Sequence, residues 1–503
     1  MGKPFVKFHH VTFKYESAIE PLFKNISFHV ASGWSGVAGA NGTGKTTLLK
    51  LATGSLDPDE GQVELPQNAI YCSQRTDDIP DKFNELTLTK SRSAWFIKSM
   101  LGIHQDWIER WTTLSHGERK RAQIGVALWL KPDLLALDEP TNHVDSEARE
   151  VITNALHAFR GIGLLVSHDR ELLDSLCQQC LFIDPPEVIT RPGGITEGMQ
   201  IAKAEQHSLQ KQYKLKKHVY KKLVREAVRR RELAKQAQRR RSKRYLTAKD
   251  HDAREKKDRA RMTGKDGVGG KLHRQLQGRL KQTHKQVEMI RIKKEDTLGI
   301  WLPGSLSKRD FLLKLPADDL MLGNLKQLHH PELLIKPGDR IAVMGPNGSG
   351  KSTLIRLIVR SLNVPKEHVT YIPQEIDFHQ SRNILSRALT LPKEKLGHLM
   401  TIVSRLGSRP QRLLSSAEPS PGETRKLLLA IGMTHSPHII VMDEPTNHMD
   451  LPSIECLEQA LLDCPCSLLL VSHDRQFIQK LTKTTWNITK DPCVEEAFVM
   501  RII

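Results

Sequence analysis

No segment of this 503-residue chain approaches the run of about 18 apolar residues that a membrane-spanning helix requires. The first ten residues contain no apolar core of the kind that a secretory signal carries. The seven cysteines are an odd number, and the pair Cys177 and Cys180 has no second pair at the spacing of a zinc ribbon. These absences favour reduced thiols in or near a core, and they predict a soluble, cytoplasmic protein.

The middle of the chain is poor in helix-breaking residues and in negative charge. Between Gly198 and Asp296 there is no proline, and the first glycine is Gly264. Residues 201–300 contain 32 Lys and Arg against 11 Asp and Glu, a balance of +21, while the whole chain carries +19. Because a solvated helix usually mixes its charges, this excess predicts a polyanionic partner for the middle region.

The two flanking regions repeat each other, with a sequence of the type GxxxxGK[ST] recurring at an offset of 306 residues. Each copy lies between a strand-like run and a helical run, which is the context of a phosphate-binding loop. Glycines let backbone N–H groups turn toward phosphates, and the lysine adds a positive charge. The predicted phosphate loops consist of Gly39, Asn41, Gly42, Gly44, Lys45, Thr46 and Thr47, and of Gly345, Asn347, Gly348, Gly350, Lys351, Ser352 and Thr353.

In each half an apolar strand-like run ends in two acids. We expect the first acid and the hydroxyl of the phosphate loop to hold Mg²⁺, and the second acid to orient or deprotonate the attacking water. A second apolar run ends in a histidine, interpreted as a sensor of the γ-phosphate. The metal ligands predicted here are Thr46, Asp138, Ser352 and Asp443, and the catalytic residues are Glu139, His168, Glu444 and His473.

Between these motifs, each half carries a serine, a glycine and a glutamate before a basic helix start, namely Ser115, Gly117 and Glu118, and Ser420, Gly422 and Glu423. A serine and a glycine at a helix N-terminus favour an anion. The whole set of motifs resembles the ATP-binding-cassette ATPases, whose cassettes pair head to tail. The resemblance implies that each Ser-x-Gly-Glu segment caps the ATP held by the other half, so that Ser420 caps ATP at Lys45 and Ser115 caps ATP at Lys351.

The same resemblance assigns further ATP contacts. Gln74 and Gln374 correspond to the family's metal-contacting glutamines, and Tyr15 is placed to stack on adenine, where the second half has Met321. The second Ser-x-Gly-Glu segment follows Pro419 where the family usually has leucine, but the serine and glycine are kept. We therefore expect two sites competent for hydrolysis.

The segments Asp138–Asp145 and Asp443–Asp450 contain Asn-His where transporter cassettes usually carry small residues. With a tandem chain and no membrane domain, this pattern resembles the ABC-F proteins, ATPases that act on ribosomes. The resemblance implies an α/β fold with two P-loop cassettes, residues 1–194 and 299–503, joined by a long basic α-helical hairpin linker, residues 195–298. It also implies a monomer whose two cassettes pair within the chain.

The linker shows two narrow apolar stripes at helical spacing, which predict two antiparallel helices of roughly 70 Å and 37 Å. Either the longer helix reaches back over a cassette, or residues 247–270, the expected tip, fold back as a further helix. In ABC-F proteins the linker enters the tRNA exit site and its tip reaches toward the peptidyl-site tRNA. The predicted RNA contacts are Arg240, Arg241, Lys243, Arg244, Lys249, His251, Arg254, Lys257, Arg261, Lys265 and Lys271.

Some ABC-F members protect ribosomes from antibiotics bound near the peptidyl-transferase centre, and others are general translation factors that often carry an extra helical arm. Only 41 residues separate Gln74 from Ser115, against 46 between Gln374 and Ser420, which leaves no room for an arm and favours ribosome protection. A general translation factor is the first alternative. A tandem ATPase subunit of a sugar importer is the second, although it has no reason to carry the basic insertion. DNA-repair cassettes, a third class, usually have one cassette per chain.

Overall fold

The computed structural model describes residues 4–142, 144–241, 265–289, 303–323, 326–406, 420–447, 449–492, 494 and 497–503. By its contacts the chain divides into two units. One consists of Met1–Gly198 together with Asp296–Ile503, and the other is Met199–Glu295. Within the described residues, no helix is both long enough and apolar enough to cross a membrane.

The first cassette is built on a six-stranded sheet of order β5-β6-β7-β3-β8-β9 and a three-stranded antiparallel sheet of order β2-β1-β4. In the larger sheet the first five strands are parallel and only β9 is antiparallel. The strands are β1 (Val6–Phe13), β2 (Phe23–Val30), β3 (Gly33–Ala38), β4 (Glu60–Glu64), β5 (Ala69–Cys72), β6 (Leu134–Asp138), β7 (Ile162–Val166), β8 (Cys177–Asp184) and β9 (Glu187–Pro192).

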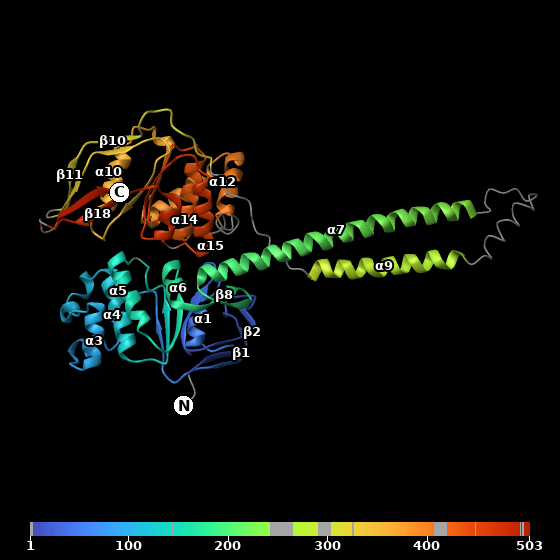
Figure 1. Ribbon diagram of the computed structural model, residues 1–503, viewed down its shortest axis with the longest axis horizontal. Coiled ribbons are helices and arrows are strands. Elements are labelled where there is room, and N and C mark those ends of the chain that lie inside the picture. The colour runs from blue at the N-terminus through green and yellow to red at the C-terminus, as the bar shows by residue number, and fades with distance from the viewer. Residues whose placement is uncertain are drawn as a thin grey trace, which may run out of the picture. The chain divides into compact units, whose positions relative to one another are not determined.

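Helices cover this sheet, and Figure 1 shows α3, α4 and α5 gathered at one end of the first cassette, away from β1 and β2. The helices are α1 (Lys45–Ala52), α2 (Phe83–Leu88), α3 (Arg92–Leu101), α4 (His116–Trp129), α5 (Ser146–His157) and α6 (Arg170–Leu176), with short 3₁₀ turns at Gln105–Trp107 and Trp111–Thr113. β6 and β7 are buried at every position, because central parallel strands are covered on both faces. Their apolar runs hold the functional strand ends in fixed places.

The second cassette repeats the plan with one eight-stranded sheet of order β11-β12-β19-β18-β14-β17-β16-β15 and a two-stranded sheet, β10-β13. Its strands are β10 (Leu313–Leu315), β11 (Asp318–Leu322), β12 (Lys326–His330), β13 (Leu333–Ile335), β14 (Arg340–Met344), β15 (Val369–Ile372), β16 (Ile439–Asp443), β17 (Ser467–Val471), β18 (Thr484–Lys490) and β19 (Ala497–Ile502). Its helices are α10 (Lys351–Ser361), α11 (Phe378–Leu389), α12 (Lys393–Arg405), α14 (Pro421–Met433), α15 (Leu451–Leu462) and α16 (Arg475–Leu481), with a 3₁₀ turn at Lys366–His368. The two P-loop cassettes predicted from the sequence are therefore confirmed.

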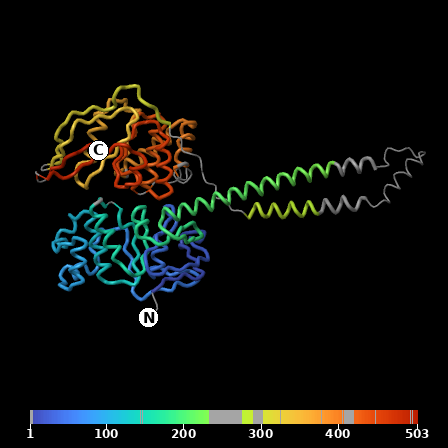
Figure 2. The backbone as a smooth tube through the Cα atoms, viewed as in Figure 1, coloured from blue at the N-terminus to red at the C-terminus, as the bar shows by residue number. Residues whose placement is uncertain are grey.

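Two long helices follow the first cassette, α7 (Ile195–Arg241, 47 residues) and α9 (Lys265–Met289, 25 residues). Figures 1 and 2 show them side by side and antiparallel, as the two apolar stripes predict. Tyr220 of α7 and His284 of α9 contact each other with ring centroids 5.2 Å apart. The unequal helix lengths agree with the expected lengths of roughly 70 Å and 37 Å.

The beginning of α7, at the predicted first residue of the linker, contacts the first cassette. Ile195 is fully buried, and Thr196 donates backbone and hydroxyl hydrogen bonds to the carboxylate of Asp174 in α6. At the other end, α9 begins at Lys265, so that Gly267, Gly269 and Gly270, which belong to the expected tip, lie in helix. Each glycine destabilises a helix by roughly 1 kcal/mol relative to alanine. A helix that is already nucleated can include these residues, because propagation costs much less than nucleation.

Candidate nucleotide-binding sites

Each phosphate loop connects the end of a buried strand to the start of a helix. In the first cassette, Nζ of Lys45 donates to the carbonyls of Gly39 (3.0 Å) and Ala40 (3.3 Å), so the ammonium group lies across the mouth of the loop. Lys351 does the same with Gly345 (2.8 Å) and Pro346 (2.9 Å). Both loops thus place a cation and the free N–H groups of a helix N-terminus at one point, which suits a polyphosphate.

The glycine directly before each of these lysines has a backbone conformation that disfavours other residues. Gly44 and Gly350 have φ values of 96° and 89°, in the left-handed region. A Cβ at Gly44 would lie 2.7 Å from a methyl carbon of Leu22, and one at Gly350 would lie 2.5 Å from a methyl carbon of Leu322. A side chain would therefore strain the backbone and clash at both positions.

The predicted metal ligands of each half lie together at the end of a central strand. The hydroxyl of Thr46 donates to Oδ2 of Asp138 (2.7 Å), and the hydroxyl of Tyr71 approaches the same oxygen (3.2 Å). In the second cassette Ser352 is hydrogen-bonded to Asp443. Burial raises the pKa of Asp443, and the bond to Ser352 and the charge of Lys351 oppose the increase. Each site thus offers adjacent hydroxyl and carboxylate oxygens, the donors that Mg²⁺ prefers.

The second acid and the histidine form one unit in each half. Oε2 of Glu139 accepts a hydrogen bond from the backbone N–H of His168 (3.2 Å), and Oε1 lies 3.1 Å from Nε2 of the same histidine. The corresponding distances for Glu444 and His473 are 3.4 Å and 3.5 Å. Both glutamates have φ of 48°, an uncommon backbone conformation for a residue with a side chain, which is typical of functional sites.

Burial tunes the groups of the second site. It raises the pKa of the Glu444 carboxyl, while the nearby Lys351 opposes the increase. It also lowers the pKa of His473 to about 4, with Lys351 adding to the decrease, so the imidazole is neutral near pH 7. Oε1 of Glu444 is buried and has no hydrogen-bond donor among the described residues. A raised pKa makes the ionised form of the Glu444 carboxyl a stronger base, which is suited to accept a proton from water.

Two basic residues near the starts of α4 and α14 belong to no recognisable site motif, but they connect the site loops. Lys120 is fully buried and donates to the carbonyl of Ser73 (2.7 Å) and to Oε1 of Gln123 (3.0 Å). Burial lowers its pKa to about 8. Arg425, 305 residues later, donates to the carbonyls of Gln374 and Asn447. The only signal in the sequence was a basic residue at the same position of both halves.

The Ser-x-Gly-Glu segments begin α4 and α14 as capping boxes. Oγ of Ser115 accepts from the N–H of Glu118 (3.2 Å), and the Glu118 carboxylate accepts from the N–H of Ser115 (2.8 Å). Ser420 and Glu423 form the same box. Both glutamates therefore stabilise a helix start. Gly117 and Gly422, each the second residue of its helix, are buried.

The adenine and glutamine candidates occupy comparable places beside the phosphate loops. The hydroxyl of Tyr15 is hydrogen-bonded to Oγ1 of Thr47 (2.8 Å), and the residue is 44% exposed, so a ring face is open to a ligand. Gln74 and Gln374 lie two residues beyond the ends of β5 and β15. Met321, the counterpart of Tyr15, is 58% exposed and lines the pocket of the second site.

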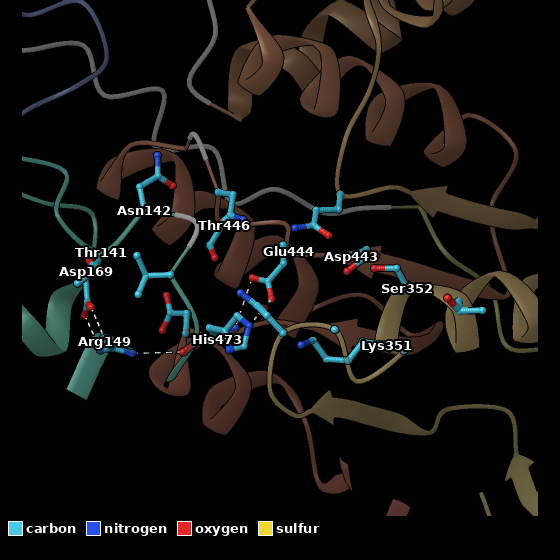
Figure 3. A pocket seen from close by; sticks show the side chains of 18 of the residues that line it. Thr141, Asn142, Arg149, Asp169, Lys351, Ser352, Asp443, Glu444, Thr446 and His473 are labelled. Atoms are coloured by element: carbon cyan, nitrogen blue, oxygen red, sulfur yellow. Dashed lines mark hydrogen bonds and ion pairs between the residues drawn. The ribbon is translucent and has the colours of Figure 1, made fainter. Parts of the chain in front are cut away.

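That pocket has a volume of about 510 Å³ and is formed by both cassettes. Figure 3 shows Lys351, Ser352, Asp443, Glu444 and His473 around it. The first cassette contributes Glu139, Thr141, Asn142, Val144, Arg149, His168 and Asp169. The loop after the first acid pair thus lines the pocket, whereas Ser115 and Gly117 are not among its described lining residues.

The first phosphate loop also contacts the opposite cassette. Oδ2 of Asp450, the N-cap residue of α15, accepts from the backbone N–H of Asn41 (2.8 Å). Burial alone would raise the pKa of Asp450, but its bonds to Ser453 and Asn41 and the charge of Lys426 lower it. Each phosphate loop is therefore adjacent to the segment that follows the acid pair of the other half, as in a reciprocal pair of cassettes.

Only four of the eleven predicted RNA contacts lie within the described residues. Arg240 and Arg241 lie at the end of α7, and Lys265 and Lys271 lie in α9, but their side chains are not described. The other predicted contacts lie outside the described residues, and they are Lys243, Arg244, Lys249, His251, Arg254, Lys257 and Arg261.

Comparisons with known proteins agree with this arrangement. Residues 23–142 and 328–447 each match the family model described as ABC transporter. The chain is 26% identical to "Ribosome protection protein VmlR" of Bacillus subtilis, over 93% of this chain and 84% of that protein. It is also 26% identical to "Energy-dependent translational throttle protein EttA" of Escherichia coli, over 92% of this chain and 88% of that protein.

Solved structures show the same fold. "RNase-L Inhibitor" superposes with a TM-score of 0.61 at 18% identity, over 98% of this chain and 90% of that one. An archaeal ribosome recycling factor, aABCE1, solved in complex with the archaeal ribosomal stalk protein aP1, gives a TM-score of 0.62 over 97% of this chain and 89% of that one, also at 18% identity. The two cassettes and their sites define an ATP-binding-cassette ATPase, which binds and hydrolyses ATP. Within that class, the similarity to the ribosome protection protein and the translational throttle protein supports the resemblance to the ABC-F proteins.

Proposed function

We propose that this protein binds the ribosome in its ATP-bound state and protects it from antibiotics bound at the peptidyl-transferase centre. The observation that supports this most directly is the similarity to a ribosome protection protein along nearly the whole chain. In this proposal residues 1–194 and 299–503 are the cassettes, and residues 195–298 are the linker that enters the tRNA exit site and contacts the peptidyl-site tRNA. The protein would act as a monomer in the cytoplasm.

The charge of the linker supports an RNA partner. The positive balance of residues 201–300 exceeds that of the whole chain. Lys214, Lys221 and Lys222 are exposed along α7, where they could contact RNA phosphates. Such contacts release counterions, so that binding should weaken as salt increases.

At each ATP site the residues fit a Mg²⁺–ATP complex. Thr46 with Asp138, and Ser352 with Asp443, provide the oxygen ligands, to which we add Gln74 and Gln374 by analogy. When bound, Mg²⁺ would neutralise charge on the β- and γ-phosphates. Lys45 and Lys351 would turn from the loop carbonyls to the phosphates. Glu139 and Glu444 would hold the attacking water, and His168 and His473 would keep each carboxylate in place.

The ATP dependence can be tested with the double variant Glu139→Gln and Glu444→Gln. It should bind ATP but not hydrolyse it, and therefore co-sediment with ribosomes in the presence of ATP. The matched control adds Lys45→Ala and Lys351→Ala, which should abolish ATP binding and release the ribosomes. If the Gln variant remains in the supernatant with ATP, ribosome binding by the closed state is wrong.

The linker can be tested separately by exchanging the three exposed lysines of α7. Lys214→Glu, Lys221→Glu and Lys222→Glu together should weaken co-sedimentation and reduce its salt dependence, while basal ATPase activity persists. The control changes the same three residues to arginine, which keeps the charge. Equal co-sedimentation of both variants would exclude an electrostatic role for this part of α7.

A general translation factor is the second candidate, since the chain is equally similar to a translational throttle protein. Expression in a drug-sensitive host separates the two. Protection predicts that the unaltered protein improves growth in at least one antibiotic directed at the peptidyl-transferase centre. The double variant Glu139→Gln and Glu444→Gln should give no such improvement. A general factor predicts no gain with any such drug but a change in translation rate in vitro.

A further inference from the structure

Arg149, in the first turn of α5, contacts two acidic residues of its own cassette and one residue of the opposite cassette. Its side chain is only 15% exposed. Its Nε lies 2.5 Å from Oδ2 of Asp169, and a terminal nitrogen donates to Oδ1 of the same carboxylate (2.6 Å) and to Oε2 of Glu171 (2.8 Å). The other terminal nitrogen donates to the backbone carbonyl of His473 in the opposite cassette (3.3 Å). Figure 3 shows the contacts of Arg149 with Asp169 and His473 beside the pocket.

Both ends of this bridge belong to histidine segments of the ATP sites. Asp169 directly follows His168, and its carboxylate also caps α6 by accepting from the N–H of Leu172 (3.0 Å). His473 is the histidine of the second site, and its own N–H donates to Glu444 (3.4 Å). Arg149 therefore contacts the histidine segment of the first site through Asp169. It is connected to Glu444 of the second site through its bond to His473 and the bond from His473 to Glu444.

The repeat shows that the bridge is one-sided. The residue 305 positions after Arg149 is Ile454, which has no donor. Asp474, the counterpart of Asp169, still caps α16 through the N–H of Phe477 (3.0 Å). A histidine segment therefore keeps its local structure without an arginine. This internal comparison indicates that Arg149 is not needed to fold its own segment, and that its distinctive contact is the one to His473.

Charge explains why an arginine occupies this place. Burial raises the pKa of Asp169, Arg149 opposes the increase, and Asp474 of the other cassette is close enough to add to it. Two like charges at the junction of the cassettes would repel each other unless a cation lies between them. A guanidinium can hold a carboxylate with two nitrogens and still donate from the third, which a lysine cannot do with the same geometry.

We propose that Arg149 is a positioning residue for ATP hydrolysis at the Lys351 site, and that it makes this site depend on the histidine segment of the first cassette. Loss of the guanidinium would free the carbonyl of His473 and let its N–H move relative to Glu444. Because the water must be held within a few tenths of an ångström, the effect should fall on turnover and not on ATP affinity. ATP hydrolysis can be measured without ribosomes, so this effect does not depend on ribosome binding.

The test isolates one site at a time. In a Glu139→Gln background only the Lys351 site hydrolyses ATP. There, Arg149→Ile, which installs the residue of the second cassette, should lower kcat by about tenfold and change KM less than about twofold. Arg149→Lys should recover part of the loss. In a Glu444→Gln background, where only the Lys45 site works, the same Arg149→Ile change should lower kcat at least fivefold less.

Two further variants serve as controls for a general loss of structure. Arg160→Ile, at an exposed arginine beyond the end of α5, should leave both kcat values unchanged. Asp169→Asn removes the charge at the other end of the bridge, and combined with Arg149→Ile it should add little to the loss. An equal loss of kcat in the two backgrounds, a change confined to KM, or no change at all would overturn the proposal.

Discussion

The two cassettes carry the same chemical groups at the same strand ends, but their surroundings differ. Glu139 and Glu444 share one backbone conformation, and each lies against the histidine of its own half. The side chains at the junction of the cassettes and beside the phosphate loops are not all shared. Arg149 corresponds to Ile454, and Tyr15 corresponds to Met321. Duplication therefore preserved the chemistry within each half, while the surroundings of the two sites diverged.

The ion pairs between the cassettes show the same divergence. Arg170 and Glu458 form a buried pair at 2.7 Å, with side chains 5% and 6% exposed, and Lys480 adds a second contact to Glu458 at 2.8 Å. On the opposite side the corresponding arginine, Arg475, is 60% exposed and lies 3.9 Å from Glu171. The two sides of the cassette pair are therefore held together with different strengths.

The largest effect is expected from the catalytic carboxylates taken one at a time. Glu139→Gln and Glu444→Gln should each slow single-turnover hydrolysis at their own site by about 10²–10⁴-fold, since each removes a base that water requires. The measurement is ADP formation at limiting ATP. If the two sites are chemically equivalent, the slow phases left by the two variants will have equal rates. Unequal rates would show how far the surroundings matter.

The buried pair gives the next largest effect. Glu458→Gln leaves the Arg170 guanidinium buried without a counter-charge, and it should reduce the free energy of unfolding by about 3–5 kcal/mol. Arg475→Gln, on the exposed side, should change it by less than about 1 kcal/mol. Denaturant unfolding of the full chain measures both. Similar losses for the two variants would contradict the inferred difference between the two sides.

A third prediction concerns pH. The folded pKa of His473 is about 4, below the ordinary value of 6.5, so the unfolded chain binds a proton that the folded chain does not. The contribution of His473 to the free energy of unfolding, about 3 kcal/mol, is therefore fully present above about pH 6.5. It is lost as pH falls toward 4. His473→Gln should show a smaller loss over this range in unfolding experiments. Burial also lowers the pKa of His168, so His168→Gln should act in the same direction.

The smallest effect is expected at the adenine positions. Tyr15→Ala removes an exposed ring beside the first phosphate loop, and should weaken ATP binding there by about 1 kcal/mol, roughly fivefold in Kd. Met321→Tyr should strengthen binding at the second site by a similar factor. Fluorescent ATP titrations of the two variants would compare them. If both leave Kd unchanged, adenine does not stack at these positions.

The sequence predicted the elements that carry the site because their signals are local. The run Gly33–Ala38 and the phosphate loop after it identify strand, loop and helix within about 20 residues. The two long linker helices followed from the absence of proline and from the apolar stripes. The start of α9 was harder to place, because glycines at 267, 269 and 270 indicate a loop when they are considered without the helix that follows them.

The sequence by itself determined the chemistry of each half, since a phosphate loop, an acid pair and a histidine are recognisable wherever the chain places them. Only the tertiary structure decided how the parts are joined. Lys120 reaches the carbonyl of Ser73, 47 residues away, and Arg149 reaches that of His473, 324 residues away. A backbone carbonyl is present at every residue and leaves no mark in a sequence. Which carbonyl an arginine meets depends on the packing of the two cassettes.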